Sequence, residues 1–251
     1  MNISLYQAAS ALSANLRWQE VVSENLAASS VPGFKKRDIS FSAVQAGSLP
    51  ANPTGPLGLS QPNSLPRATI TTSFQPGEIK PTGVKTDLAI EGSAFFEVQL
   101  PNGTAAFTRD GEFQVNAHGQ LVTKEGYLVM SDSGPIQLDL NNPVPMSVSP
   151  AGEVGQGLDL KGKLKLVEFA NPQLLTQASG GYFIGQDPNM VGQPTTTSTV
   201  RQGFLEGSNT TTVAEMASLM SALRTFEANQ RIIQLQDERL GKTIGELGNP
   251  S

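Results

Sequence analysis

The sequence predicts an α+β protein, with a helix near each end of the chain and a central, mostly antiparallel β-rich domain. Near both ends apolar residues recur at the three-four spacing of a helix, whereas the middle alternates apolar and polar residues between glycine turns. Gly (25) and Pro (17) are abundant, and only 16% of the 251 residues are charged. This composition is typical of a chain with many turns and short strands.

The N-terminal helix is predicted over residues 3–27. Its apolar face includes Leu5, Leu12, Leu16 and Leu26. Pro32 and Gly33 prevent the helix from continuing, because proline clashes with helical backbone and glycine lets the chain turn.

The C-terminal helix is predicted over residues 210–245. Its apolar seam consists of Val213, Met216, Met220, Leu223, Phe226, Ile233, Leu240 and Ile244. A seam of this length favours coiled-coil packing. Each terminal helix must bury its apolar stripe, either against the other within one chain or against another subunit. The position of both helices at the ends of the chain favours assembly between subunits.

Residues 45–68 hold five prolines and a single charged residue, Arg67. We expect no regular structure there, but an extended arm or linker that reaches a neighbouring subunit. The predicted organisation has three parts. Residues 1–30 and 208–246 form a discontinuous helical domain, residues 31–68 a turn and arm, and residues 69–207 the β-rich domain.

The predicted β-rich domain is built around regularly spaced turns. The turn dipeptides are Asn102-Gly103, Asp110-Gly111, His118-Gly119 and Glu125-Gly126. Glycine after Asn or Asp supplies the backbone conformation of a tight hairpin, so we expect an antiparallel meander. A β-solenoid is the alternative that the same rhythm allows. Further strands are expected at 135–140, 145–150, 163–169 and 181–185.

Residues suited to catalysis or metal binding are few. The chain has no cysteine, which excludes disulfides and thiolate chemistry, and its one histidine, His118, sits beside a turn glycine. Asp87, Asp110 and Glu112 are candidates for a glycosidase-like carboxylate pair, although turn chemistry explains them more simply. We predict no catalytic, cofactor-binding or metal-binding residue.

The charge pattern bears on possible partners. The net charge is −5, which argues against a dedicated nucleic-acid binder. The basic cluster Lys35-Lys36-Arg37 is interpreted as a solvated turn. No apolar run approaches the ~20 residues that cross a bilayer, and the first residues lack the pattern of a cleaved signal peptide. We therefore predict no nucleic-acid partner, no membrane insertion and, if the protein is exported, no cleaved signal.

Residues 25–41, NLAASSVPGFKKRDISF, resemble the signature of the flagellar basal-body rod and hook family. The matching positions are Asn25, Leu26, Ala27, Pro32, Gly33, Phe34, Lys35 and Phe41. The central block is similar to that family from Gly92 through Thr108-Arg109-Asp110-Gly111 to Gly126. The C-terminal matches are Glu206, Ser208, Asn209, Glu215, Met216, Arg224, Phe226, Glu227, Asn229, Asp237 and Leu240. The chain departs from the family pattern at Ala28, Val31 and Ala222-Leu223.

The resemblance implies a non-enzymatic structural subunit of the flagellar rod. Its terminal helices would form an inner coiled-coil layer around a channel, with the β-rich domain outside. Implied partners are copies of itself, other rod and hook subunits, surrounding ring proteins and the type III export apparatus, and the implied location is the periplasmic rod. The expected assembly residues are Leu5, Leu12, Leu16, Asn25, Leu26, Ala27, Pro32, Gly33, Phe34, Lys35, Phe41, Met216, Met220, Leu223, Arg224, Phe226, Glu227, Asn229, Ile233 and Leu240.

The interpretation as a rod subunit leads to two hypotheses about assembly, and two alternative functions stay open. We expect the terminal helices to order on assembly. We also expect Phe34 to anchor the turn, so that Gly33→Val blocks assembly while the β-rich domain stays folded. The alternatives are a hook or rod-junction subunit of the same family, and a secreted carbohydrate-binding module or enzyme with oligomerising helices.

Overall fold

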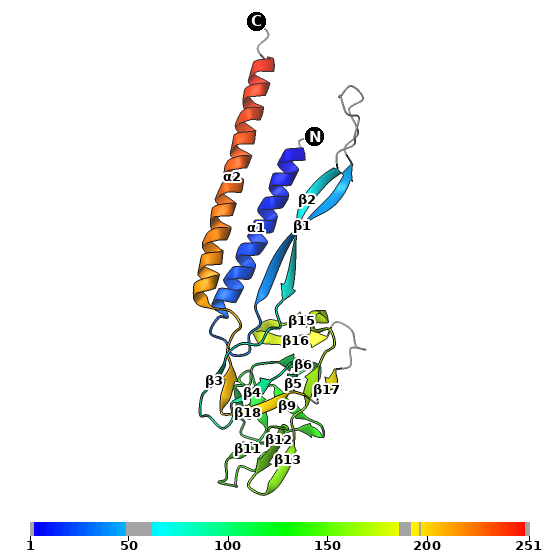
Figure 1. Cartoon of the computed structure of the whole chain (residues 1–251), viewed down its shortest axis with the longest axis vertical. Helices are drawn as coiled ribbons and strands as arrows, with labels where there is room; N and C mark the ends of the chain where they lie inside the picture. Colours follow the sequence, from blue (N-terminus) through cyan, green and yellow to red (C-terminus); the bar gives the residue numbers. More distant parts are fainter. Residues whose placement is uncertain (1–2, 49–61, 186–191, 196, 249–251) are drawn as a thin grey trace. The chain divides into compact units, whose positions relative to one another are not determined.

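The computed structural model describes residues 3–48, 62–185, 192–195 and 197–248, and it is an α+β structure with helices at both ends and a β-rich middle (Figure 1). The chain forms two compact units. The helical unit comprises the described residues of Met1–Ala27, Arg37–Thr71 and Thr212–Ser251. The β unit comprises those of Ala28–Lys36 and Thr72–Thr211.

The helical unit contains both long helices, α1 (Ile3–Ala27) and α2 (Thr212–Gly248), which pack side by side (Figure 1). Among the described side chains of the two helices, the buried apolar residues are small or β-branched: Ala14, Val21, Val22 and Ala222. The predicted helices at both ends of the chain are therefore confirmed. Within one chain, the two helices pack against each other. Within the described residues, no helix is long and apolar enough to cross a membrane.

A long two-stranded sheet, β1 (Arg37–Ser48) with β2 (Pro62–Thr72), completes the helical unit. The prediction that residues 45–68 lack regular structure is wrong at both ends of that range, because 45–48 belong to β1 and 62–68 to β2. Residues 49–61 lie outside the described part. A two-stranded sheet tolerates Pro62 and Pro66 because each strand has one edge that needs no backbone donor.

The β unit is organised around one large antiparallel sheet with the order β15-β16-β6-β5-β9-β8-β7. These strands are β5 (Phe95–Gln99), β6 (Ala105–Thr108), β7 (Phe113–Val115), β8 (Leu121–Thr123), β9 (Leu128–Ser131), β15 (Leu175–Gln177) and β16 (Tyr182–Gly185). Three further strands belong to this sheet outside that order. β10 (Gly134–Pro135) pairs with β9, β14 (Leu166–Glu168) pairs with β5, and β17 (Gln193–Pro194) pairs with β14.

Three smaller sheets complete the unit. They are β11 (Met146–Val148) with β12 (Glu153–Gln156) and β13 (Asp159–Lys163), β18 (Thr199–Gln202) with β4 (Leu88–Glu91), and β19 (Phe204–Glu206) with β3 (Ile79–Pro81). Two 3₁₀ turns, η1 (Pro172–Leu174) and η2 (Ser179–Gly181), flank β15. The predicted strand at 135–140 is reduced to Pro135, and that at 163–169 is interrupted between β13 and β14.

The predicted antiparallel meander is confirmed in part. The turn expected at Asp110-Gly111 does not join paired strands, because β6 and β7 lie apart in the sheet, the oxygen of Gly111 accepts from the N–H of Leu88, and β9 pairs with β5. The β-solenoid alternative does not describe this sheet. β5 and β6 pair across Asn102-Gly103, β7 and β8 across His118-Gly119, and β8 and β9 across Glu125-Gly126. The glycine of each turn has a positive φ. These hairpins surround a dense apolar core that includes Phe96, Val98, Phe113, Leu121 and Val129.

Candidate functional site

The turn that follows α1 belongs to the β unit and is built into it. Gly33 has a φ of +66°, and its N–H donates to the backbone oxygen of Glu206 at 2.7 Å. A Cβ on Gly33 would lie 2.3 Å from the backbone carbon of Arg109, closer than any real side chain approaches. Phe34 is buried. This position therefore requires glycine for two reasons, its left-handed backbone and its contact with Arg109.

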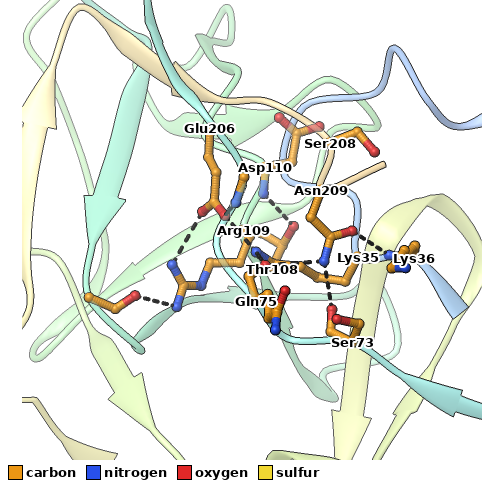
Figure 2. A network of polar contacts seen from close by, with 12 residues as sticks. Lys35, Lys36, Ser73, Gln75, Thr108, Arg109, Asp110, Glu206, Ser208 and Asn209 are labelled. Carbon is orange, nitrogen blue, oxygen red and sulfur yellow. Dashed lines mark hydrogen bonds and ion pairs between the residues drawn. The ribbon is translucent and has the colours of Figure 1, made fainter. Parts of the chain in front are cut away.

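Lys35 is buried directly after this turn, with a side chain that is 1% exposed. Its Nζ lies 2.5 Å from Oε1 of Glu206 and donates to the backbone oxygen of Gln75 at 2.9 Å (Figure 2). The interpretation of Lys35-Lys36-Arg37 as a solvated turn is wrong for Lys35. Its partner lies 171 residues further along the chain, where local sequence cannot reveal it.

Glu206 is the centre of the site and also has a side chain that is 1% exposed. Its Oε1 accepts from the N–H of Gly77 at 2.8 Å, and its Oε2 pairs with Nη1 of Arg109 at 3.2 Å. Nη2 of Arg109 donates to the backbone oxygen of Gly92 at 2.7 Å (Figure 2). The guanidinium also stacks over Phe95, 4.9 Å from the ring centroid. One carboxylate thus holds two cations inside the β unit.

Burial dominates the electrostatics of these cations. Desolvation lowers the pKa of Lys35 and of Arg109, and the negative charge of Glu206 opposes both shifts. Because two cations share one carboxylate, each cation makes the other less favourable, and removal of the carboxylate would leave both without a counter-charge. The Nε of Arg109 has no hydrogen-bond partner among the described residues.

Asn209 adds a second set of bonds beside Glu206. Its Oδ1 accepts from the N–H of Lys36 at 2.7 Å, and its Nδ2 donates to the backbone oxygens of Ser73 at 2.8 Å and Gln75 at 3.1 Å (Figure 2). The N–H of Ser73 in turn donates to the oxygen of Lys36. We refer to Lys35, Arg109, Glu206 and Asn209 as the Glu206 network. It joins the segment of Arg109 to three other segments of the β unit, 33–36, 73–77 and 206–209, which lie close in sequence to the helical unit.

The end of α1 carries a separate polar contact within the helical unit. The side-chain amide of Asn25 donates to the backbone oxygen of Arg37 and accepts from its N–H, both at 2.9 Å. The same amide lies 3.5 Å from a carboxylate oxygen of Glu215 on α2. Arg37 also pairs with Glu24 at 2.6 Å. Asn25 therefore has a role within one chain, because it joins the end of α1 to the start of β1.

The other predicted assembly residues of the helical unit are more exposed. Leu16, Phe41, Met216, Met220 and Leu223 are about half exposed, although the ring of Phe41 packs edge-on against Trp18. Ala27, Arg224 and Glu227 are exposed, whereas Leu12, Leu26, Phe226, Asn229 and Ile233 are partly buried, as is Pro32 of the β unit. The side chains of Leu5 and Leu240 lie outside the described part. Of the predicted assembly residues, Asn25, Gly33, Phe34 and Lys35 are therefore buried within one chain, whereas those described on the helices other than Asn25 are partly buried or exposed.

The carboxylates considered for catalysis have structural roles. Asp110 pairs with Lys124 at 2.8 Å and accepts from the N–H of Glu112, while Asp87 and Glu112 face each other in a β-bridge. His118 is exposed. Across the described residues, no group of three His, Cys, Asp or Glu side chains is placed to bind a metal ion. The Glu206 network is a set of charge-paired and hydrogen-bonded groups, an arrangement that fixes backbone segments.

The sequence analysis includes Lys35 among the site residues but gives no role to Arg109 or Glu206, which only match the family pattern. For Asn209 the local sequence suggests an N-cap of the C-terminal helix, and not the bonds to Lys36, Ser73 and Gln75 that the structure shows. The one local signal is the placement of Glu206 and Asn209: Glu206-Gly-Ser-Asn209 stands directly before the predicted C-terminal helix, and Lys35 follows the turn that ends the N-terminal one.

Three family models match successive parts of the chain. They are "Flagella basal body rod protein" at residues 5–35, "Flagellar hook protein FlgE/F/G D1 domain" at 89–156 and "Flagellar basal body rod FlgEFG protein C-terminal" at 201–246. The first includes the Gly33 turn and Lys35, the second includes Arg109, and the third includes Glu206 and Asn209.

Relatives match over nearly the whole chain. The flagellar basal-body rod protein FlgF of Caulobacter vibrioides is 32% identical, with 99% of both chains covered. The flagellar basal-body rod protein FlgG of Borreliella burgdorferi is 30% identical over 95% of this chain and 96% of its own. FlgF of Escherichia coli is 28% identical over 96% of this chain and 97% of its own.

Proposed function

The chain belongs to the flagellar basal-body rod protein family, and we propose that it is a structural subunit of the rod. The observation that carries this proposal is the similarity to proteins named as rod proteins over nearly the full length of both chains. The family is a structural component of the flagellum and not an enzyme. The alternative of a secreted enzyme or carbohydrate-binding module is therefore set aside.

We propose that subunits polymerise through the terminal helices, which form the coiled-coil inner layer of the rod. The supporting observation is the apolar surface that remains when α1 and α2 pack together in one chain. Leu16, Met216, Met220 and Leu223 stay about half exposed, as do Ile232 and Leu235 further along α2. Exposed leucine and methionine at helical spacing favours burial against another helix.

The Glu206 network suits a subunit that must hold one shape in a polymer. It ties the chain just after α1 to the chain just before α2, and both to the segment that follows β2. A buried ion pair of this kind favours one specific arrangement of its segments, even where an apolar replacement would be equally stable. We propose that the network fixes where the three connections leave the β unit.

The proposed location and partners follow from family membership. The subunit would assemble with copies of itself and with other rod and hook subunits in the basal body. Contacts with surrounding ring proteins, export by the type III apparatus without a cleaved signal, and a periplasmic position are the finer parts of this proposal. A hook or rod-junction subunit is the second candidate, favoured by the match to the FlgE/F/G model.

Deletion of the gene tests the proposal directly. Basal bodies purified from the deletion strain are expected to carry a truncated rod without a filament, and the cells should not swim. The length of the remaining rod, measured by electron microscopy, would distinguish a rod subunit from a junction subunit. Complementation with the unmodified gene is the control. Complete basal bodies and normal swimming in the deletion strain would contradict the proposal.

A further inference from the structure

A patch of exposed apolar side chains lies at the hairpin of β12 and β13 in the β unit. Leu158 is fully exposed, and Leu160, Leu140 and Val144 are 69%, 60% and 43% exposed. We refer to these four residues as the Leu158 tip. Exposed apolar side chains that gather in one place, instead of being scattered singly, are typical of interaction surfaces.

The fold itself does not require leucine at the centre of this tip. Gln156 pairs with Asp159, so Gly157 and Leu158 form the two-residue turn between β12 and β13. Gly157 has a φ of +70° and supplies the backbone conformation that such a turn needs. The position after this glycine is typically Asn, Asp or Ser. A leucine there, with no cover from the described residues, indicates a contact with a partner.

One buried amide holds the Leu158 tip together. The Nε2 of Gln156 donates to the backbone oxygens of Asp139 at 2.9 Å and Val144 at 3.1 Å, and its Oε1 accepts from the N–H of Asp139. Leu140 follows Asp139 directly. A carbon added to Gly157 would lie 3.8 Å from a methyl group of Val144. The loop before β11 is thus fixed beside the hairpin, and the tip is ordered before any partner binds.

The β unit also contains a cavity of about 470 Å³. Its volume falls within the ~300–1,000 Å³ that is typical of binding pockets. The charged groups in its wall are Arg109 and Glu206, which already pair with each other (Figure 2). The walls therefore favour an uncharged, aliphatic occupant. The apolar lining consists of Phe74, Phe95, Phe169, Pro76, Pro172 and Ile90.

The cavity and the Leu158 tip lie at opposite ends of the β unit. Phe74 and Phe169 pack against a cluster that includes Leu175 of β15 and Phe183 of β16, whereas β12 and β13 carry the tip. Figure 1 shows these two pairs of strands at opposite ends of the β unit. Because both belong to one compact unit, the tip cannot reach the cavity of its own chain. Only the tip of a second copy can occupy it.

The charges beside the two surfaces are complementary. Glu91 is exposed at the cavity, and Lys163 is exposed on β13, three residues after Leu160. Among the described residues neither forms an ion pair, whereas the neighbouring Lys161 and Lys165 both have acidic partners. A charge pair beside an apolar contact fixes the register of the contact and disfavours wrong partners.

We propose that the Leu158 tip of one subunit inserts into the Phe74–Phe169 cavity of the next subunit, with Lys163 of the first beside Glu91 of the second. Tip and cavity are different surfaces of the same unit, so the contact is head-to-tail and can continue from subunit to subunit in an open helical polymer. This inference rests on the proposed function. It adds to it a defined contact between β units, in addition to the proposed contacts between helices.

Engineered cysteines test this contact, because the natural chain has no cysteine. The test variant is Leu158→Cys with Glu91→Cys, which joins the tip to the cavity. The control is Leu158→Cys with Thr104→Cys, since Thr104 is exposed in the turn between β5 and β6 and does not line the cavity. Basal bodies are oxidised and then run on a non-reducing gel. A disulfide forms only when the two Cα atoms come within ~7 Å.

The expected result is cross-linked dimers and larger species for the test variant and monomers for the control. Monomers in both variants, with the subunit present in basal bodies, would overturn this inference alone, and so would equal cross-linking in both. Absence of the unmodified chain from basal bodies would overturn the proposed function and this inference together.

A charge exchange provides a second test that does not depend on the cysteine variants. Lys163→Glu and Glu91→Lys should each reduce the diameter of swimming rings in soft agar, because each places like charges opposite one another. The double variant restores an opposite pair and should swim better than either single variant. A double variant that swims no better than the worse single variant would overturn the assigned pair.

The apolar part of the contact is tested by Leu158→Asp. This change affects a fully exposed side chain, so the β unit should stay folded by circular dichroism while swimming is lost. Thr104→Asp adds the same charge at an exposed turn outside both surfaces and should swim normally. Normal swimming by Leu158→Asp would overturn the insertion of the tip.

Discussion

The β unit and the helical unit are stabilised in different ways. The β unit buries large side chains such as Phe96, Phe113 and Leu121 and encloses an ion network in which each charged group has a partner. The helical unit buries mainly alanine and valine from its two helices and leaves leucine and methionine half exposed. This difference indicates that the β unit completes its core within one chain, whereas the helices leave apolar surface exposed, as the proposed assembly through them requires.

The largest expected effect is that of Glu206→Gln, which would test whether the β unit depends on its buried charges. The substitution keeps the shape but leaves Lys35 and Arg109 without a counter-charge, so the β unit should lose about 3–5 kcal/mol of unfolding free energy. Hydrogen exchange of peptides from β5 measures this loss. The control Glu91→Gln changes an exposed carboxylate and should have little effect. Equal exchange in the two variants would mean that the network contributes no stability.

The second-largest loss of unfolding free energy is expected for Gly33→Ala. The added Cβ would need an unfavourable positive φ and would collide with the backbone of Arg109. We expect a loss of about 2–4 kcal/mol in the β unit, combining backbone strain with displacement of the turn. Gly126→Ala is the matched control, because Gly126 has a similar φ of +87° but no atom within 4 Å of the added carbon. Denaturation by urea should separate the two variants, and identical midpoints would refute the collision.

The same geometry changes the prediction for Gly33→Val. We expected this variant to block assembly while the β-rich domain stays folded. Since Gly33 lies against Arg109 within the β unit, a valine there should also destabilise that unit.

Asn25→Ala tests the helical unit at its main polar contact. The variant removes the amide that bonds both backbone groups of Arg37, and we expect a loss of about 1–3 kcal/mol confined to the helical unit. Hydrogen exchange should rise in peptides from the end of α1 and the start of β1, and β5 should be unaffected. Asn229→Ala, at a partly buried position on α2, is the control. Faster exchange throughout the β unit would mean that the two units are less independent than the comparison suggests.

The smallest effect on the isolated chain is expected for Met220→Glu. Met220 is 56% exposed, so its replacement should change monomer stability by less than about 0.5 kcal/mol. In cells the same variant should abolish swimming, because a carboxylate would have to be buried between subunits. Gln234→Glu adds the same charge at an exposed polar position of α2 and should swim normally. Normal swimming by Met220→Glu would place the proposed helical interface elsewhere.

Local sequence was sufficient for the elements whose signals are local. The expected helix at 3–27 coincides with α1, and the expected helix at 210–245 differs from α2 by a few residues. Gly103, Gly119 and Gly126 mark turns because a tight hairpin needs their backbone freedom. The two-stranded sheet does not follow from the local sequence, because its prolines indicate irregular structure there. Strands with a free edge, however, accommodate proline.

The site itself depends on residues that are far apart in sequence. Lys35 looked like one of three solvated cations, and its burial follows from Glu206, which no local pattern connects to it. Arg109 belongs to a predicted turn, yet its guanidinium forms an ion pair with the carboxylate of Glu206. Family resemblance pointed to these positions without indicating their contacts. The pairing of strands β3 and β19 brings Glu206 next to the segment of Gly77, and the hydrogen bond from Gly33 to Glu206 brings in the turn after α1.

The separation of Lys35 and Glu206 also determines when the fold can be completed. The contact closes a loop of 171 residues, so the turn after α1 has no counter-charge until most of the chain is available. Contacts between distant segments form late, because the entropy of closing the loop must be overcome first. A chain that becomes available from its N-terminus onwards would thus present the turn after α1 well before Glu206, the residue that completes the ion pair of Lys35.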